Sequence, residues 1–238
     1  MDDIFEKLVS QRRSIRIFDK SPMPEAIVEK CLDLALLAPN SSNLQPWEFH
    51  WVRKEPLRKS LVEACLSQSA AATAAELIVC IARTNTWQQA RTDMITQMTE
   101  KKNQGEKIPD AAWLYYRKLV PIMYRQGWFS VLGCLKKIIF FAIGLKKPMM
   151  REPTSHQDLR IWAIKSTALA CENLMLAATA YGYDSCPMEG MDSTRVRKLL
   201  NLPRHSDVVM VIALGKRASN GVTLPRIRGE RSRYVIHH

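Results

Sequence analysis

The sequence is poor in glycine and in acidic residues. Of its 238 residues, 9 are Gly and 12 are Pro, which excludes collagen-like and low-complexity chains. Hydrophobic residues make up 47% and charged residues 24%, the composition of a globular protein with a sizeable core. Asp and Glu number 23 against 35 Lys and Arg, so the formal net charge is +12. This surplus predicts an anionic partner: a phosphate-bearing cofactor, an acidic membrane surface or nucleic acid.

Several familiar motifs are also absent. The six Cys form no Cys-x-x-Cys pair, so we interpret them as small core residues in a reducing compartment. The acidic start of the chain lacks the basic and apolar regions of a signal peptide, which predicts a cytoplasmic protein. No nucleic-acid-binding module is recognisable, so we expect no nucleic-acid partner. His50, His156 and His205 are scattered and indicate neither a metal site nor a catalytic triad.

Residues 128–148, WFSVLGCLKKIIFFAIGLKKP, are the most apolar stretch. Lys136 and Lys137 interrupt it, so it is too short to be a membrane-spanning helix, which needs about 20 apolar residues. Three interpretations stay open: a buried or dimer-interface helix, a lid over a ligand, or an interfacial membrane anchor. We expect an amphipathic helix in which both Lys pairs, 136–137 and 146–147, reach water or anionic headgroups.

Periodicity predicts the order of the elements. Alternating or continuous apolar patterns predict strands over 47–52, 77–82, 183–187 and 208–214. Helical spacing predicts helices over 2–10, 24–37, 56–66, 162–181 and 192–200, with two more helices within 84–125. Strands therefore alternate with helices, and a long helical segment intervenes. This order predicts a mixed α/β or α+β fold, one domain over 1–238 with a helical insert at about 84–159.

Two basic segments are candidates for binding phosphate. Arg12, Arg13, Ser14 and Arg16 lie within five residues of each other, and Arg guanidinium groups bind phosphate in a bidentate manner. Near the other end of the chain, Arg226 and Arg228 alternate in an extended tail, so both side chains point the same way. Each segment alone is also compatible with a solvated basic surface.

Two further segments are candidates for binding a planar ligand. The loop 38–47 carries Asn40, Asn43 and Gln45, whose amides can pair with the polar edge of a heterocycle. Residues 186–191 pass from a strand end through Gly190 to a helix cap. Folds with α/β architecture place ligands at such strand ends, and glycine permits close approach of the backbone.

Together, the order and spacing of these four segments resemble the flavin-dependent nitroreductase family, over about residues 3–82 and 160–228. The resemblance implies an α+β fold with a mostly antiparallel sheet, and a homodimer with two FMN sites at its interface. It implies NADH or NADPH as reductant and a nitroaromatic, a quinone or a related electrophile as the small-molecule substrate. The insert carries no signal of this family.

The resemblance also assigns roles to residues. Arg12 and Ser14 would face the flavin phosphate together with Arg226 and Arg228, while Arg13 belongs to the same run and Arg16 would face the pyrimidine edge. Asn40 and Asn43 resemble residues from the second subunit, and Gln45 belongs to their loop. Pro187, Met188, Glu189 and Gly190 resemble the strand end against the ring, and a further polar contact falls near Ser67 or Gln68. No side-chain acid or base is expected; Arg16 and Glu189 would support chemistry carried by the flavin.

Two other functions remain open from the sequence. The first is a different reaction on the same scaffold, such as reductive dehalogenation or flavin fragmentation, with the insert shaping the pocket. The second is non-enzymatic binding of an anionic polymer or membrane, driven by the net charge of +12.

Overall fold

A four-stranded antiparallel sheet organises the residues that the computed structural model describes, 3–127 and 131–238. Its strands are β1 (Trp47–Val52), β2 (Glu76–Arg83), β3 (Asp184–Met188) and β4 (Ser206–Gly215), in the order β1-β2-β4-β3. The central strands β2 and β4 are apolar on both faces because helices cover both sides. The predicted mixed fold with an antiparallel sheet is confirmed, and β3 lies at an edge.

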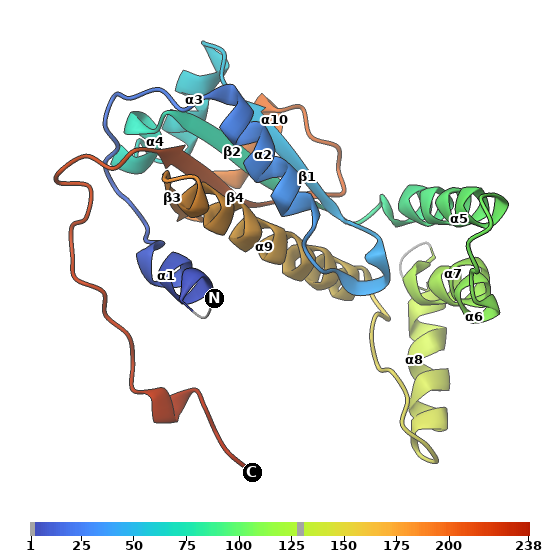
Figure 1. The fold of residues 1–238 in the computed structure, drawn as a ribbon. Helices are drawn as coiled ribbons and strands as arrows, with labels where there is room; N and C mark the ends of the chain where they lie inside the picture. Colours follow the sequence, from blue (N-terminus) through green and yellow to red (C-terminus); the bar gives the residue numbers. More distant parts are fainter. Residues whose placement is uncertain (1–2, 128–130) are drawn as a thin grey trace.

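Helices form a layer on each face of the sheet (Figure 1). One layer consists of α2 (Glu25–Leu36) and the long α9 (His156–Ala180), which pack on the side chains of Ile78, Cys80 and Ile212. The other consists of α3 (Leu57–Ala64), α4 (Ser69–Thr73) and α10 (Ser193–Leu199), packed on Leu77, Val79 and Val211. The N-terminal α1 (Ile4–Gln11) lies against α9.

Two helix starts differ from the sequence prediction. Helix α9 begins at His156, six residues before the expected start, because Ser155 caps it: its Oγ accepts a hydrogen bond from the Asp158 N–H at 3.0 Å. Ser155 with Asp158 three residues later is a capping pattern that was readable in the sequence. Helix α1 begins at Ile4, and Asp3 at its N-cap makes no side-chain cap bond. The expected cap, Asp2, lies outside the described residues.

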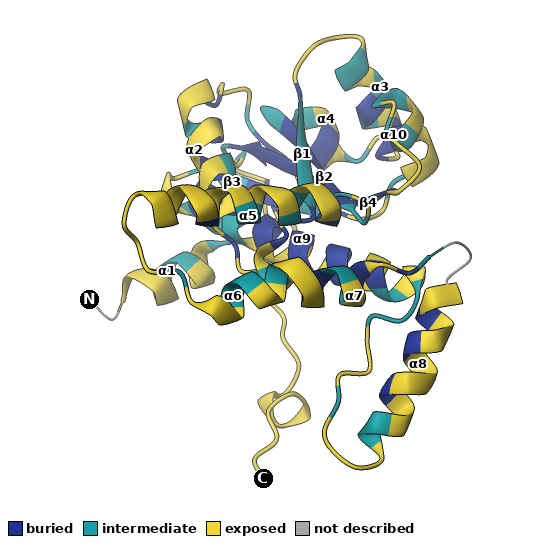
Figure 2. Ribbon diagram, turned by 90° about the vertical axis from the view of Figure 1, so that its right-hand side faces the viewer, coloured by how far each residue is buried: buried dark blue, intermediate teal, exposed yellow. Residues whose placement is uncertain are grey.

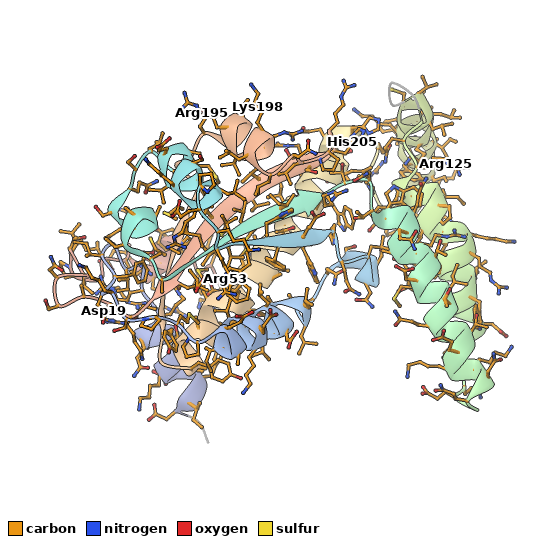
Figure 3. The ribbon with its side chains drawn as sticks, turned by 90° about the horizontal axis from the view of Figure 1, so that it is seen from above. Asp19, Arg53, Arg125, Arg195, Lys198 and His205 are labelled. Atoms are coloured by element: carbon orange, nitrogen blue, oxygen red, sulfur yellow. The ribbon has the colours of Figure 1, made fainter. Side chains whose placement is uncertain are left out.

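The segment between β2 and α9 is helical, as predicted for the insert. It contains α5 (Trp87–Asn103), α6 (Asp110–Leu114), a π-helical turn (Tyr115–Leu119), α7 (Val120–Tyr124) and α8 (Val131–Gly144). Seen from above, these helices lie beyond one end of the sheet layers (Figure 3). None of the helices in the described ranges is long and apolar enough to cross a membrane.

Helix α8 turns a lysine inward, contrary to our prediction that Lys136 would reach water. Lys136 is buried, and its Nζ donates to the Met123 carbonyl at 2.8 Å and the Pro153 carbonyl at 3.3 Å. The carbonyl at Met123 belongs to the last turn of α7, where helix carbonyls have no partner within the helix and favour a cation; Gln126 Nε2 also donates to it at 3.3 Å. Phe140, one turn further along the same side of the helix, is buried as well. The first residues of the predicted segment, 128–130, lie outside the described residues.

This burial gives a paired prediction. Lys136→Met should lower the free energy of unfolding by about 1–3 kcal/mol, because two carbonyls lose a charged donor in a buried place. Lys137→Met, which removes the same group from the exposed neighbour, should change it by less than about 0.5 kcal/mol. Urea denaturation of both variants measures the difference, and equal stabilities would show that the two hydrogen bonds contribute nothing.

Candidate flavin site

Backbone pairing places the basic run 12–16 between the edge strand and the C-terminal tail. The Ile15 N–H donates to the Ser185 carbonyl of β3 at 3.0 Å, and Ser14 forms a parallel bridge with the same residue. The Arg16 N–H donates to the Gly221 carbonyl at 2.9 Å. The run therefore extends the sheet beyond β3, and the tail follows it.

Five arginines surround a cavity of about 200 Å³ at this junction. Arg13 donates to the Leu224 carbonyl at 2.6 Å, and Arg226 donates to the carbonyls of Ser10 and Arg12, both at 2.7 Å. The basic run and the tail pair, far apart in sequence, thus meet in space. The lining residues are Arg12, Arg13, Ser14, Arg16, Val222, Thr223, Leu224, Pro225, Arg226, Ile227 and Arg228.

The electrostatics of this arginine cavity favour an anion. The pKa of Arg226 lies below its ordinary value, first because its guanidinium is partly dehydrated and then because Arg228, Arg13 and Arg12 are positively charged. No Asp or Glu is among the described residues that line the cavity, and Arg12 Nε forms an ion pair with Glu172 at 3.6 Å. A phosphate group has the charge and the several acceptor oxygens that this donor set requires.

The strand end at 187–190 lies next to the same run. Pro187 and Met188 are the last residues of β3, and Glu189 and Gly190 are exposed beyond them. Burial raises the pKa of the Cys186 thiol and the charge of Arg16 opposes this rise, which places Arg16 beside β3. Gln68 Nε2 donates to the Gly190 carbonyl at 2.6 Å. Gln68 therefore lies beside the strand end. It is one of the two positions near which the resemblance implied a further polar contact.

The amide loop lies elsewhere in the chain. Asn40 Oδ1 accepts from the Gln45 N–H at 2.8 Å, and Asn43 Nδ2 donates to Met94 Sδ of α5 at 3.3 Å. Asn40 lines a cavity with residues from the first half of α9, whereas Arg12 contacts Glu172 in its second half. In Figure 1 the connection from α2 to β1 and the connection from α1 to α2 lie toward opposite ends of α9. The described chain therefore does not bring Asn40, Asn43 or Gln45 to the five arginines.

Tyrosines of the insert hold this loop. Ser42 Oγ lies 2.6 Å from Tyr115 Oη and 3.0 Å from Tyr124 Oη, and Tyr116 Oη donates to the Ser42 carbonyl at 3.1 Å. Ser42 has a φ of 62°, a left-handed conformation that a non-glycine residue adopts only with such support. These tyrosines could not be assigned to the site from the sequence, because the insert has no family pattern. Their only signal was a cluster of hydroxyl-bearing aromatics.

A second, larger cavity of about 580 Å³ lies between the loop and the insert. Most of the surface that faces it is apolar, and Glu152, Asp158 and Lys165 add charged side chains at its wall. The lining residues are Asn40, Ser41, Ser42, Tyr115, Leu119, Met123, Tyr124, Met149, Met150, Glu152, Pro153, Asp158, Trp162, Lys165, Ser166 and Leu169. A cavity of this size and polarity suits a small, mostly apolar molecule.

Two glycines of the site give contrasting predictions. A Cβ at Gly221 would lie 2.5 Å from the Ile17 carbonyl oxygen, so Gly221→Ala should force the tail away from the run and destabilise the fold by about 1–3 kcal/mol. A Cβ at Gly190 would meet only Gln68 Nε2, at 3.6 Å, so Gly190→Ala should fold with unchanged stability. Thermal unfolding of the two ligand-free variants tests this contrast; a stable Gly221→Ala protein would contradict the tight pairing.

Known proteins resemble this chain in sequence and in fold. The model of the Nitroreductase family matches residues 9–216. Protein DrgA of a Synechocystis strain is 31% identical over 92% of this chain and 86% of its own length. An NADH dehydrogenase of Thermus thermophilus is 28% identical over 93% of this chain and 90% of its own length.

A solved structure supports the fold. A protein of Exiguobacterium sibiricum, assigned as a nitroreductase and crystallised in complex with FMN, superposes with a TM-score of 0.73 at 22% identity, over 98% of this chain and 97% of its own. The family match covers the sheet, the basic run and the strand end. The resemblance read from the residues is confirmed: this chain belongs to the nitroreductase family.

Proposed function

We propose that this chain is an FMN-dependent oxidoreductase that uses NADH or NADPH to reduce a small electrophile such as a nitroaromatic or a quinone. The observation that carries the proposal is the cavity at the sheet edge, where five arginines and Ser14 converge and none of the lining residues that the structure describes is Asp or Glu. The Thermus relative is named an NADH dehydrogenase and the Exiguobacterium structure contains FMN, which supports the same cofactors here. A cytoplasmic location is part of the proposal.

Different residues would bind different parts of FMN. Arg12, Ser14, Arg226 and Arg228 would bind the phosphate, with Arg13 keeping the tail in place through the Leu224 carbonyl. Arg16, beside β3, would place a positive charge near the pyrimidine edge, where it favours the more negative reduced form. FMN, when bound, supplies hydride transfer between the nicotinamide and the acceptor.

The strand end would present backbone groups to the ring. Glu189 and Gly190 follow β3 on the surface, and Gln68 fixes the Gly190 carbonyl at 2.6 Å. Gly190 has no Cβ, so a planar ring can approach its backbone closely. Pro187 and Met188 anchor this segment in the sheet through pairing with β4. No side-chain acid or base is assigned.

The proposal includes a homodimer in which Asn40, Asn43 and Gln45 serve the cofactor held by the partner subunit. The separation of these residues from the arginine cavity in one chain supports this arrangement. An apolar groove between α1, α2 and α9, with Phe5 69% and Leu37 74% exposed, is the surface that a second copy would cover. The groove is lined by Phe5, Leu8, Leu34, Leu37, Asn173, Leu176, Ala177 and Ala180.

The 580 Å³ cavity is the proposed entry for the electron acceptor. It adjoins the loop that carries Asn40, and insert residues such as Leu119, Met123 and Met150 form its apolar wall. The insert would therefore select the substrate, in agreement with its lack of a shared family pattern.

Peripheral membrane contact through residues 128–148 is a second part of the proposal and does not depend on the flavin.

The test is direct. Purified protein should be yellow and release FMN on denaturation, and it should oxidise NADH or NADPH when a quinone or nitroaromatic is added. Absorbance near 340 nm follows the reductant while high-performance chromatography identifies the released flavin. A colourless protein that binds no added FMN would overturn the proposal, whereas bound FMN without turnover of either acceptor would overturn the assigned substrate class.

A further inference from the structure

Helix α8 has an inverted distribution of polar and apolar side chains. Its inward face consists of Gly133, Lys136 and Phe140, and the buried Lys136 donates to two backbone carbonyls. Its outward face consists of apolar residues, of which Leu135 is 54% and Ile138 67% exposed. Figure 2 shows the exposed band along the helix. A helix that faced only water would carry charge on this side.

The charges around this face all have one sign. Residues 131–151 contain five basic side chains and no Asp or Glu. Lys137 is exposed on α8, and Lys146 and Lys147 are exposed just beyond its end. Arg151 returns to the helix and donates to the Phe140 carbonyl at 3.1 Å. Within residues 131–151 the charges beside the apolar face are therefore all positive, and the first acidic residue, Glu152, follows Arg151.

This charge pattern decides between two occupants of the face. A second copy of the chain would bring Lys137, Lys146 and Lys147 toward a protein that already has a net charge of +12, and the segment offers no carboxylate to pair with them. An anionic lipid surface attracts each of these lysines and takes up the apolar side chains between them. The lipid surface matches both properties of the face.

The position and length of α8 suit an interfacial helix. Its 14 residues correspond to a length of about 21 Å, less than the roughly 30 Å hydrocarbon core of a bilayer. In Figure 1, α8 extends away from the sheet and its helical layers. The outward face can therefore lie along a membrane plane while the sheet remains in water.

We propose that α8 docks this protein peripherally on anionic bilayers, with Leu135, Ile138 and their apolar neighbours inserted among the lipids and the exposed lysines at the headgroups. The chain that follows α8 lines the 580 Å³ cavity with Met149 and Met150. Docking thus brings the cavity close to apolar molecules dissolved in the membrane; this consequence rests on the proposed function, whereas docking itself does not.

The experiment is cosedimentation of the flavin-loaded full chain with vesicles of phosphatidylcholine alone or with 30% phosphatidylserine, at low and high salt. We expect binding only to the vesicles that contain phosphatidylserine, with release at high salt. Ile138→Glu should abolish binding. Ile236→Glu adds the same charge at an isoleucine that is 70% exposed near the C-terminus, and it should bind like wild type.

A second pair of variants tests the charges. The double substitution Lys146→Gln with Lys147→Gln should lower partitioning by about fivefold for each lysine removed. Arg195→Gln with Lys198→Gln removes two charges from α10, where both side chains point away from the body (Figure 3), and should change partitioning by less than about twofold.

Three results would overturn the proposal. These are no binding to phosphatidylserine vesicles, binding that survives Ile138→Glu, and a smaller oligomer for Ile138→Glu in light scattering, which would show that a second copy covers the face. Flavin absorbance is recorded on each sample. Yellow protein that fails to bind vesicles refutes docking alone, and colourless protein that binds them refutes only the flavin assignment.

Discussion

Arg228→Ala is expected to lower the affinity for FMN by about tenfold or more, because a charged hydrogen bond to a buried phosphate contributes at least that factor. Arg12→Ala and Arg226→Ala should have effects of the same size. Arg226→Ala should also loosen the tail, since Arg226 holds the carbonyls of Ser10 and Arg12. Titration of flavin-free protein, followed by the quenching of FMN fluorescence, measures each dissociation constant.

The control for this series is Arg195→Ala. It removes the same side chain from α10, where Arg195 is exposed and, among the residues that the structure describes, pairs with Asp192 alone, at 3.1 Å, an arrangement that contributes little. Arg195→Ala should bind FMN like wild type, which separates local phosphate contacts from the general effect of lowering the net charge. Unchanged affinity in all three cavity variants would remove the phosphate assignment.

Mixing two defective variants should restore flavin binding. One variant carries Arg226→Ala and Arg228→Ala, the other Asn40→Ala and Asn43→Ala. If each site combines the arginines of one subunit with the amide loop of the other, a mixed dimer contains one intact site and one doubly damaged site. Random exchange of subunits then restores about a quarter of all sites from two populations that bind FMN poorly.

The measurement is the FMN retained after subunit exchange and gel filtration, with each variant exchanged against itself as the control. Recovery in the mixture alone would establish that the site spans two subunits. No recovery, with mixed dimers demonstrated by differently tagged chains, would mean that each chain builds its own site. A monomer that binds FMN stoichiometrically would contradict the dimer itself.

Local signals in the sequence were sufficient for most of the fold. The alternation at 47–52 and the apolar runs at 77–82 and 208–214 became β1, β2 and β4, because apolar spacing directly reflects which faces are buried. The helix predicted over 192–200 became α10, which Asp192 caps: its carboxylate accepts from the Arg195 N–H at 3.0 Å. The meeting of Arg12 with Arg226 could be predicted only through the family resemblance, since no local pattern relates a run to a distant tail.

Other features depend on tertiary context and could not be read from the sequence. Lys136 and Lys137 are identical neighbours, yet only Lys136 is buried, because α8 docks against the carbonyls of Met123 and Pro153, which accept from Lys136 Nζ as well as from Gln126 Nε2. Ser42 is one polar residue of a polar loop, and only the fold brings two tyrosine hydroxyls within 3.0 Å of its own. Both cases are decided by partners far along the chain.

The pairing of the N-terminal run with the tail also sets an order of events during synthesis. The contact from Arg13 to the Leu224 carbonyl joins positions 211 residues apart, so the loop it closes includes nearly the whole chain. A ribosome releases the run before the tail, and the proposed phosphate site is incomplete until both are present. Cofactor capture is then a late step of maturation, and a chain truncated before the tail would fold its sheet yet leave the cell's FMN unbound.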